Sequence, residues 1–274
     1  PLTVKLGVPR RPRLRACCSL SRTLAIIWPP SRQAVNAAVS SGSLATQLCA
    51  AGECGTSAQA VTSVNSGGGG GGNVSDDFAG NGPLLGYTTN NASALPDVER
   101  VNGRYRANLT DNTNDVTLHF NNEQGRLDAK LVSFPFEYIA YNIGIGTQSN
   151  SQTAPNPSGG SPFMFAGIQV HVTNLNSRNS AHVVVGHRGP TRFTIEGKNT
   201  VNGDSTVNDD GEDVLPLGRA DIRIVGDASR SLTVYYRAPN SNNSWIAYDG
   251  NGKLPGAEPN FGSQVYIGLI TYAF

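Results

Sequence analysis

The stretch that most constrains the fold runs from Arg219 to Tyr248 and reads RADIRIVGDASRSLTVYYRAPNSNNSWIAY. Apolar and polar residues alternate on both sides of a cluster of turn-forming residues, Gly226-Asp227-Ala228-Ser229. Alternation with a period of two, broken by such a cluster, is typical of two antiparallel strands with one buried face. The stretch therefore predicts a β-hairpin, with Ile222 and Ile224 directed to the core and Arg223 between them directed away from it.

Similar alternation recurs along most of the chain, for example in Leu127–Phe136, Phe163–Leu175 and Val265–Leu269. The chain holds 32 glycines and one methionine, which favours tight turns over helices. Roughly ten to twelve strands, separated by frequent turn signals, suit two packed sheets. The sequence therefore predicts an all-β fold, a two-sheet antiparallel jelly-roll sandwich with an irregular N-terminal extension.

Residues 1–72 differ in composition from the rest. They are basic and interrupted by proline, and they end in six consecutive glycines, Gly67–Gly72, which is typical of a flexible linker. We therefore expect a leader or extension over 1–72 and a sandwich domain over 73–274. The alternative is that part of the extension adds an edge strand or covers one sheet.

All four cysteines, Cys17, Cys18, Cys49 and Cys54, lie in this N-terminal extension. A small disulfide set, a metal site and incidental thiols are all open interpretations. The spacing lacks the paired C-x2-C and histidine pattern of a zinc site.

The charge distribution argues against nucleic acid as a partner. The whole chain has a formal net charge of +1, but residues 1–72 hold seven basic residues against the single acidic Glu53, so residues 73–274 carry 14 basic against 19 acidic residues. Phosphate binding needs clustered cations, which this composition does not offer. The chain also lacks a run of about 20 apolar residues, so no membrane span is predicted.

Three segments together resemble a known superfamily. They are Asp76-Asp77-Phe78, the strand FMFAGIQVHV at Phe163–Val172, and the hairpin with its late Trp245 and final strand. Over about residues 76–274 this pattern is similar to concanavalin A-like (laminin G-like) jelly-roll domains. The resemblance implies a ligand on the concave face of one sheet. It favours a secreted or cell-surface, lectin-like module that binds a polysaccharide or other glycan, although the superfamily also contains glucanases and polysaccharide lyases.

The candidate ligand residues are the polar residues that alternate with the predicted core positions. Aromatic faces can stack on sugar rings, and arginine can pair with a uronate carboxylate. A solvated sheet face is the alternative interpretation, and Trp245 could either stack on sugar or pack at the end of the sandwich. The predicted ligand row is Gln169, His171, Arg223, Tyr235, Arg237 and Tyr266, with Trp245 beside it.

The triplet Gln169-Val170-His171 also resembles the Q-[IV]-H motif of the alginate lyase family on this fold. That resemblance implies His171 as base and Gln169, with Arg223, on the substrate carboxylate. Tyr235 or Tyr266 would then be the acid. β-Elimination needs such a base and such donors. The family's R-x-E-L-R element is absent, and its Y-F-K-A-G-x-Y-x-Q strand has no good counterpart. The enzyme alternative is therefore a polysaccharide lyase or glycanase.

Carboxylates give two further expectations. A retaining glucanase of this fold would show E-x-D-x-x-E, and neither Glu196 nor Glu212 lies in that spacing. An acidic, strand-free loop is predicted around residues 199–217, and its oxygen ligands could hold Ca2+ or simply be solvated. The candidate calcium ligands are Asp204, Asp209, Asp210 and Asp213.

Two interpretations of other segments remain open. His182 stands near the start of an apolar strand and reads equally as a surface imidazole or as a ligand residue.

A third function class is a structural or assembly protein, in which the basic, cysteine-bearing extension at 1–72 docks on a second copy of the chain.

Overall fold

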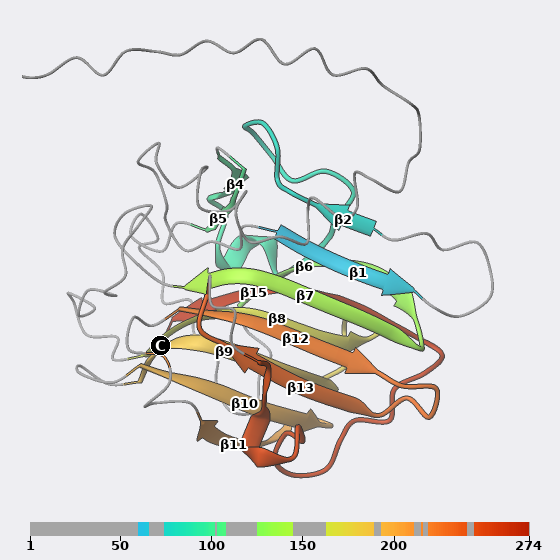
Figure 1. The fold of residues 1–274 in the computed structure, drawn as a ribbon. Coiled ribbons are helices and arrows are strands. Elements are labelled where there is room, and N and C mark those ends of the chain that lie inside the picture. The colour runs from blue at the N-terminus through green and yellow to red at the C-terminus, as the bar shows by residue number, and fades with distance from the viewer. Residues whose placement is uncertain are drawn as a thin grey trace, which may run out of the picture. The chain divides into compact units, whose positions relative to one another are not determined.

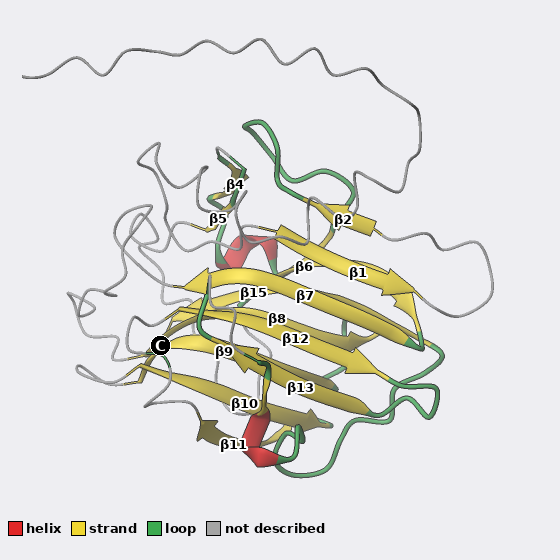
Figure 2. Cartoon of the chain, in the orientation of Figure 1, coloured by secondary structure: helices red, strands yellow, loops and turns green. Residues whose placement is uncertain are grey.

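The protein is described here from a computed structural model. The residues that the structure describes are 60–65, 74–101, 103–107, 125–144, 163–188, 193–210, 215, 219–239 and 244–273. These residues form two antiparallel sheets, one behind the other in the view of Figure 1. Figure 2 shows that nearly all of their regular structure is strand, which confirms the predicted all-β, two-sheet antiparallel sandwich.

The first sheet has six strands in the order β14-β13-β12-β7-β1-β2. Every pairing between neighbours is antiparallel. The predicted hairpin forms its β12–β13 pair, with Asp227 in the turn accepting a hydrogen bond from the Ser231 amide at 3.0 Å. The strand bounds are β1 Ala60–Asn65, β2 Val74–Asp76, β7 Phe136–Gly144, β12 Arg219–Gly226, β13 Leu232–Arg237 and β14 Ile246–Ala247.

The second sheet has seven strands in the order β11-β10-β9-β8-β15-β6-β3. Their bounds are β3 Thr88–Asn90, β6 Arg126–Ser133, β8 Phe163–Val172, β9 Ser180–Arg188, β10 Phe193–Val201, β11 Asp204–Asp210 and β15 Gln264–Ala273. A separate two-stranded pair consists of β4 (Val98–Arg100) and β5 (Tyr105–Ala107). Two short 3-10 helices lie within the described residues, η2 at Ala92–Ala94 and η3 at Tyr248–Gly250.

Strand alternation decides which side chains enter the core. On β12, Ile222 and Ile224 are fully buried, whereas Arg223 between them is only half-buried. On the seven-stranded sheet, Val170 of β8 pairs with Ile267 of β15 on an equally apolar face. The two apolar faces pack together as one hydrophobic cluster. Full burial of each large aliphatic side chain contributes about 1.5–3 kcal/mol, so this layer holds the sheets together.

Tyr248 of η3 joins the end of the six-stranded sheet to the core face of the seven-stranded one. Its ring lies so close to Gly197 of β10 that a Cβ there would come within 2.4 Å of the ring. Its hydroxyl donates to Asn208 Oδ1 of β11 at 2.6 Å. A glycine at position 197 is therefore needed for η3 to close this end of the sandwich.

The N-terminal strand of the sandwich lies before the glycine run. β1 pairs with β7 over its whole length and with β2 on its other side. Since β1 ends at Asn65 and β2 starts at Val74, Gly67–Gly72 connect two neighbouring strands of one sheet. Among the described residues the sheet thus begins at Ala60, on the N-terminal side of the boundary that composition predicts at residue 72. Glycine-rich composition indicates local backbone freedom and cannot distinguish a connection within a sheet from a linker between domains.

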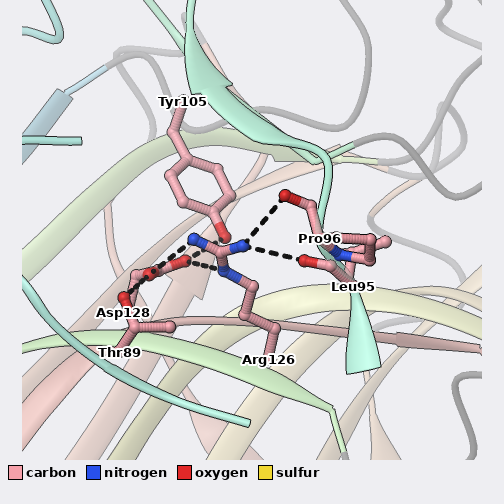
Figure 3. A network of polar contacts seen from close by, with 6 residues as sticks. All are labelled: Thr89, Leu95, Pro96, Tyr105, Arg126 and Asp128. Atoms are coloured by element: carbon pink, nitrogen blue, oxygen red, sulfur yellow. Dashed lines mark hydrogen bonds and ion pairs between the residues drawn. The ribbon is translucent and has the colours of Figure 1, made fainter. Parts of the chain in front are cut away.

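A buried carboxylate fixes the segment between β3 and β6 (Figure 3). Asp128 on β6 is fully buried and accepts hydrogen bonds from Thr89 Oγ1 at 2.6 Å and Tyr105 Oη at 2.9 Å. Arg126 Nε donates to the same carboxylate at 2.9 Å, and its terminal nitrogen donates to the Leu95 carbonyl at 2.8 Å. One ion pair thus links β6 to β3, β5 and the loop after η2.

Candidate functional site

The seven-stranded sheet carries polar side chains on the face directed away from the core. Because neighbours in a strand alternate, Gln169 and His171 of β8 lie on the face opposite to Ile168 and Val170. The strand register continues this face across β15, β9 and β10. We call it the polar face; it also carries the buried apolar side chains Phe165, Val184 and Ile270, and its principal polar members are Gln169, His171, Ser180, His182, Glu196, Lys198, Tyr266 and Tyr272.

Three of the predicted ligand residues meet on the polar face. His171 and Tyr266 stand directly opposite each other in the β8–β15 pair, and Gln169 lies two residues before His171. Gln169 Nε2 donates to Ser180 Oγ at 3.1 Å. His171 Nδ1 lies 2.7 Å from the Val172 carbonyl oxygen, which can only accept, so Nδ1 carries a hydrogen.

A second cluster on the same face was not predicted from the sequence. Tyr272 Oη donates to Glu196 Oε1 at 2.6 Å, and His182 Nε2 lies 3.5 Å from that oxygen. The His182 ring stacks on the Tyr272 ring with centroids 5.7 Å apart. His182 is 1% exposed, so its interpretation as a surface imidazole is wrong. The alternation of Thr194, Glu196 and Lys198 along β10 is the signal that could have found this face.

The electrostatics of the cluster favour an ionised Glu196. Burial acts to raise the pKa of Glu196, but the hydrogen bond and charge of His182, the Tyr272 hydroxyl and the Lys198 charge act to lower it. The lowering prevails, and the pKa of Glu196 lies below its ordinary value. A buried carboxylate beside a phenol and an imidazole can hold ligand hydroxyls, and it has the composition of a proton-transfer site.

Accessibility changes along the polar face. Gln169, His171 and His182 are at most 2% exposed. Tyr266 is half-buried, and its partner on β6, Leu131, is 47% exposed. Leu131 and Tyr266 are therefore the accessible pair on this face, and they offer an apolar and an aromatic surface.

The other four predicted ligand residues meet on the opposite side of the sandwich. Arg223 and Tyr235 are paired across β12 and β13 on the outer face of the six-stranded sheet, with the Arg223 guanidinium 5.0 Å from the Tyr235 ring. The Arg237 guanidinium lies 4.3 Å from the ring of Trp245. The hydrophobic core separates these residues from His171. The expectation of one shared groove is therefore wrong, because alternation predicts the face of a residue but not which sheet its strand joins.

This separation also corrects the roles expected for an enzyme. Arg223 cannot neutralise a substrate carboxylate beside His171, and Tyr235 cannot act as its acid, since both lie on the other outer face. Tyr266 does stand opposite His171.

The acidic segment predicted as a calcium-binding loop contains a strand. Asp204, Asp209 and Asp210 belong to β11, which pairs with β10. Asp204 and Asp210 stand at its two ends, about 20 Å apart at the ordinary strand rise, and Asp209 faces the other side. Its polar composition suits the edge position of β11, because charged edge strands resist further pairing.

The part of the chain that the structure describes offers no metal cluster in their place. Asp213 lies outside the described residues. Across the ranges that the structure describes, no three His, Cys, Asp or Glu side chains are grouped to hold a metal ion. Residues 1–59, including the four cysteines and most of the extension predicted to dock on a second copy, also lie outside the description.

Comparison of the chain with protein-family models, curated proteins and solved structures finds no match. Similarity to known proteins therefore supplies no function for this chain. Neither helix in the described part of the chain has the length and hydrophobicity required to cross a bilayer.

Proposed function

We propose that the protein is a secreted or cell-surface polysaccharide-binding β-sandwich that holds its ligand on the polar face of the seven-stranded sheet. The observation that carries this proposal is the gathering of amide, imidazole, carboxylate and phenol groups on the largely buried polar face, among the apolar side chains Phe165, Val184 and Ile270. Apolar side chains would cover such a face at lower cost, because each buried polar group needs a partner. Buried ionisable clusters are typical of binding and active sites.

The chemistry of the polar face suits a sugar chain. Tyr266 and Leu131 provide the accessible apolar surface against which the C–H face of a sugar ring can lie. Gln169 and His171 lie almost fully buried on the same face, with His171 paired to Tyr266, so they support the surface on which the sugar would lie rather than contacting it. The resemblance to concanavalin A-like jelly rolls supports the same face, through their use of a sheet surface for glycans.

The test is a panel of neutral and uronate-bearing polysaccharides, read for retention of the protein and for product release. We expect Tyr266→Ala and His171→Ala to weaken binding about tenfold or more. Arg230→Gln, in the exposed β12–β13 turn, removes an arginine away from the polar face and should bind like the parent protein. Equal binding by all three variants would place the ligand elsewhere, and the proposal would then fail.

A second candidate function, glycan cleavage, is favoured by one specific observation. Glu196 Oε1 accepts the Tyr272 hydroxyl and also neighbours the His182 imidazole. A shared oxygen of this kind can relay a proton between a base and an acid, as bond cleavage in a uronate or glycoside requires. Release of unsaturated uronate or new reducing ends, abolished in Glu196→Gln and Tyr272→Phe, would establish it. Retention without release would leave binding alone.

A further inference from the structure

The outer face of the six-stranded sheet carries a second cluster of ligand-type residues, which the proposed function does not use. We call it the arginine–aromatic surface, and its members are Arg223, Tyr235, Arg237 and Trp245 with the carboxylates Glu137 and Asp221. It extends over β7, β12, β13 and the residue before β14.

A β-bulge positions the Asp221 carboxylate beneath this surface. The register of β12 against β7 shifts between Ala220 and Ile222. At the bulge, Asp221 accepts the Asn142 amide at 2.9 Å and the Arg237 Nε at 3.0 Å. Its side chain is only 4% exposed, so Arg237 is held from below. Bulges commonly aim a side chain at a functional site.

Each of the two arginines is held by a carboxylate through its Nε, and its terminal amino groups are available to a ligand. Arg237 gives its Nε to Asp221, and Arg223 gives its Nε to Glu137. The two guanidinium groups also lie over the Trp245 ring, at 4.3 Å for Arg237 and 6.0 Å for Arg223. Among the described residues, the terminal amino groups of both arginines donate no hydrogen bond, although their side chains are 23% and 29% exposed. The surface thus presents hydrogen-bond donors that are already ordered, so binding does not have to fix the arginine side chains and lose their conformational entropy.

Charge balance decides which ligand fits. The two guanidinium groups are offset by the two carboxylates with which they pair, so the surface is neutral as a whole. An acidic chain would gain little from the arginines and would meet Glu137, which is 32% exposed. An uncharged sugar can accept hydrogen bonds from the guanidinium amino groups, donate a hydroxyl to the Glu137 carboxylate and stack on half-exposed Tyr235 and Trp245.

We propose that the arginine–aromatic surface is a second binding site, for a neutral polysaccharide chain, on the side of the sandwich opposite the polar face. This second site needs no residue of the polar face, so it can be tested independently of the proposed function.

The experiment titrates the full chain with cellohexaose and xylohexaose as neutral probes, and with oligogalacturonate as the acidic one, at low and high salt. At least one neutral probe should bind, and Trp245→Ala and Arg223→Gln should each weaken that binding about tenfold. Arg230→Gln is the matched arginine control, and Tyr266→Ala tests the polar face. Both should keep binding at this second site, and high salt should change the affinity little because no net charge is neutralised.

The results that would contradict the second site differ from those that would contradict a site on the polar face. Absence of binding by both neutral probes overturns the second site. So does binding that Trp245→Ala and Arg223→Gln leave unchanged, or binding confined to oligogalacturonate and lost in salt. Loss in Tyr266→Ala with normal binding in Trp245→Ala would keep the first site and remove the second. Circular dichroism of each variant separates loss of the site from loss of the fold, and Trp245→Phe provides a milder variant.

Discussion

At the scale of single residues, Glu196 is the position where environment most changes chemistry. Its carboxylate is largely buried, a condition that by itself favours the protonated acid. The Tyr272 hydroxyl, the His182 imidazole and the Lys198 charge reverse this preference. Residues from three strands therefore keep Glu196 ionised. Tyr272 lies on β15, His182 on β9, and Lys198 on β10 with Glu196 itself.

Replacing Tyr272 by Phe should lower stability at neutral pH and make it depend less on pH in the acid range, because the variant has less of the Glu196 contribution to lose. The pKa of Glu196 is depressed in the folded state, so its contribution to stability is complete above the ordinary value near 4.5 and is lost as pH falls through the lower folded value. Loss of the hydroxyl raises the folded pKa and costs about 1.5–3 kcal/mol at neutral pH. Urea unfolding at several pH values measures both effects. Tyr266→Phe is the control, and a parallel pH profile in both variants would contradict the account.

Asp128 gives the corresponding prediction for a structural carboxylate. Asp128→Asn leaves Arg126, whose side chain is 11% exposed, without its charge partner and should lower the free energy of unfolding by about 3 kcal/mol. Thr89→Val removes one neutral donor from the same carboxylate and should cost about 1 kcal/mol. Chemical denaturation compares the two variants. Equal losses would mean that the ion pair adds nothing beyond a single hydrogen bond.

At the scale of elements, strand packing depends on two glycines of the polar face. A Cβ at Gly268 on β15 would lie 2.0 Å from the Asp128 carbonyl oxygen, and one at Gly167 on β8 would lie 2.2 Å from that of Val183. Neighbouring strands are the obstacle in both cases, and backbone cannot move aside as a flexible side chain can. The close approach of β15 to β6, and of β8 to β9, therefore requires glycine.

Gly268→Ala should destabilise the protein by about 2 kcal/mol or more, because β15 and β6 must separate. Gly262→Ala is the matched control, since its nearest neighbour to a new Cβ is 3.8 Å away. It should change the unfolding free energy by less than about 0.5 kcal/mol. Similar thermal midpoints for the two variants would show that the strands can adjust.

The elements also show how far the sequence alone could lead. Alternation predicted the β12–β13 hairpin and the burial of Ile222 and Ile224, because a period of two is a local property. It also indicated that Gln169 and Arg223 both face away from the core. It could not tell that they belong to opposite sheets, because strand order depends on pairings distant in sequence. The acidic segment at β11 was mistaken for a loop because edge strands can be as polar as loops.

At the scale of the whole molecule, the position of β1 decides where the domain can be cut. β1 lies between β7 and β2, so its removal exposes the backbone of a nine-residue strand. Unpaired strand edges promote aggregation. The sequence boundary at residue 72 would make that cut, since it assigns β1 to the extension.

A fragment beginning at Gly55 should fold and remain monomeric, whereas one beginning at Asn73 should unfold at lower denaturant concentration and self-associate. The loss of one strand's pairing with β7 is the physical reason. Analytical ultracentrifugation and urea unfolding of both fragments give the comparison. Equal stability and equal solubility would show that β1 contributes nothing to the sheet.

The two outer faces of the sandwich have a consequence for material properties. The two proposed sites lie on opposite sides of the core, so a chain that binds glycan at both would be divalent and would join two glycan strands at a spacing set by the thickness of two sheets. Divalency raises the strength of attachment without any new contact, because the second association takes place at high local concentration. Mixed with long polysaccharides, the protein would act as a cross-linker. The viscosity of the mixture would then pass through a maximum as protein is added and decline once free sites outnumber strands.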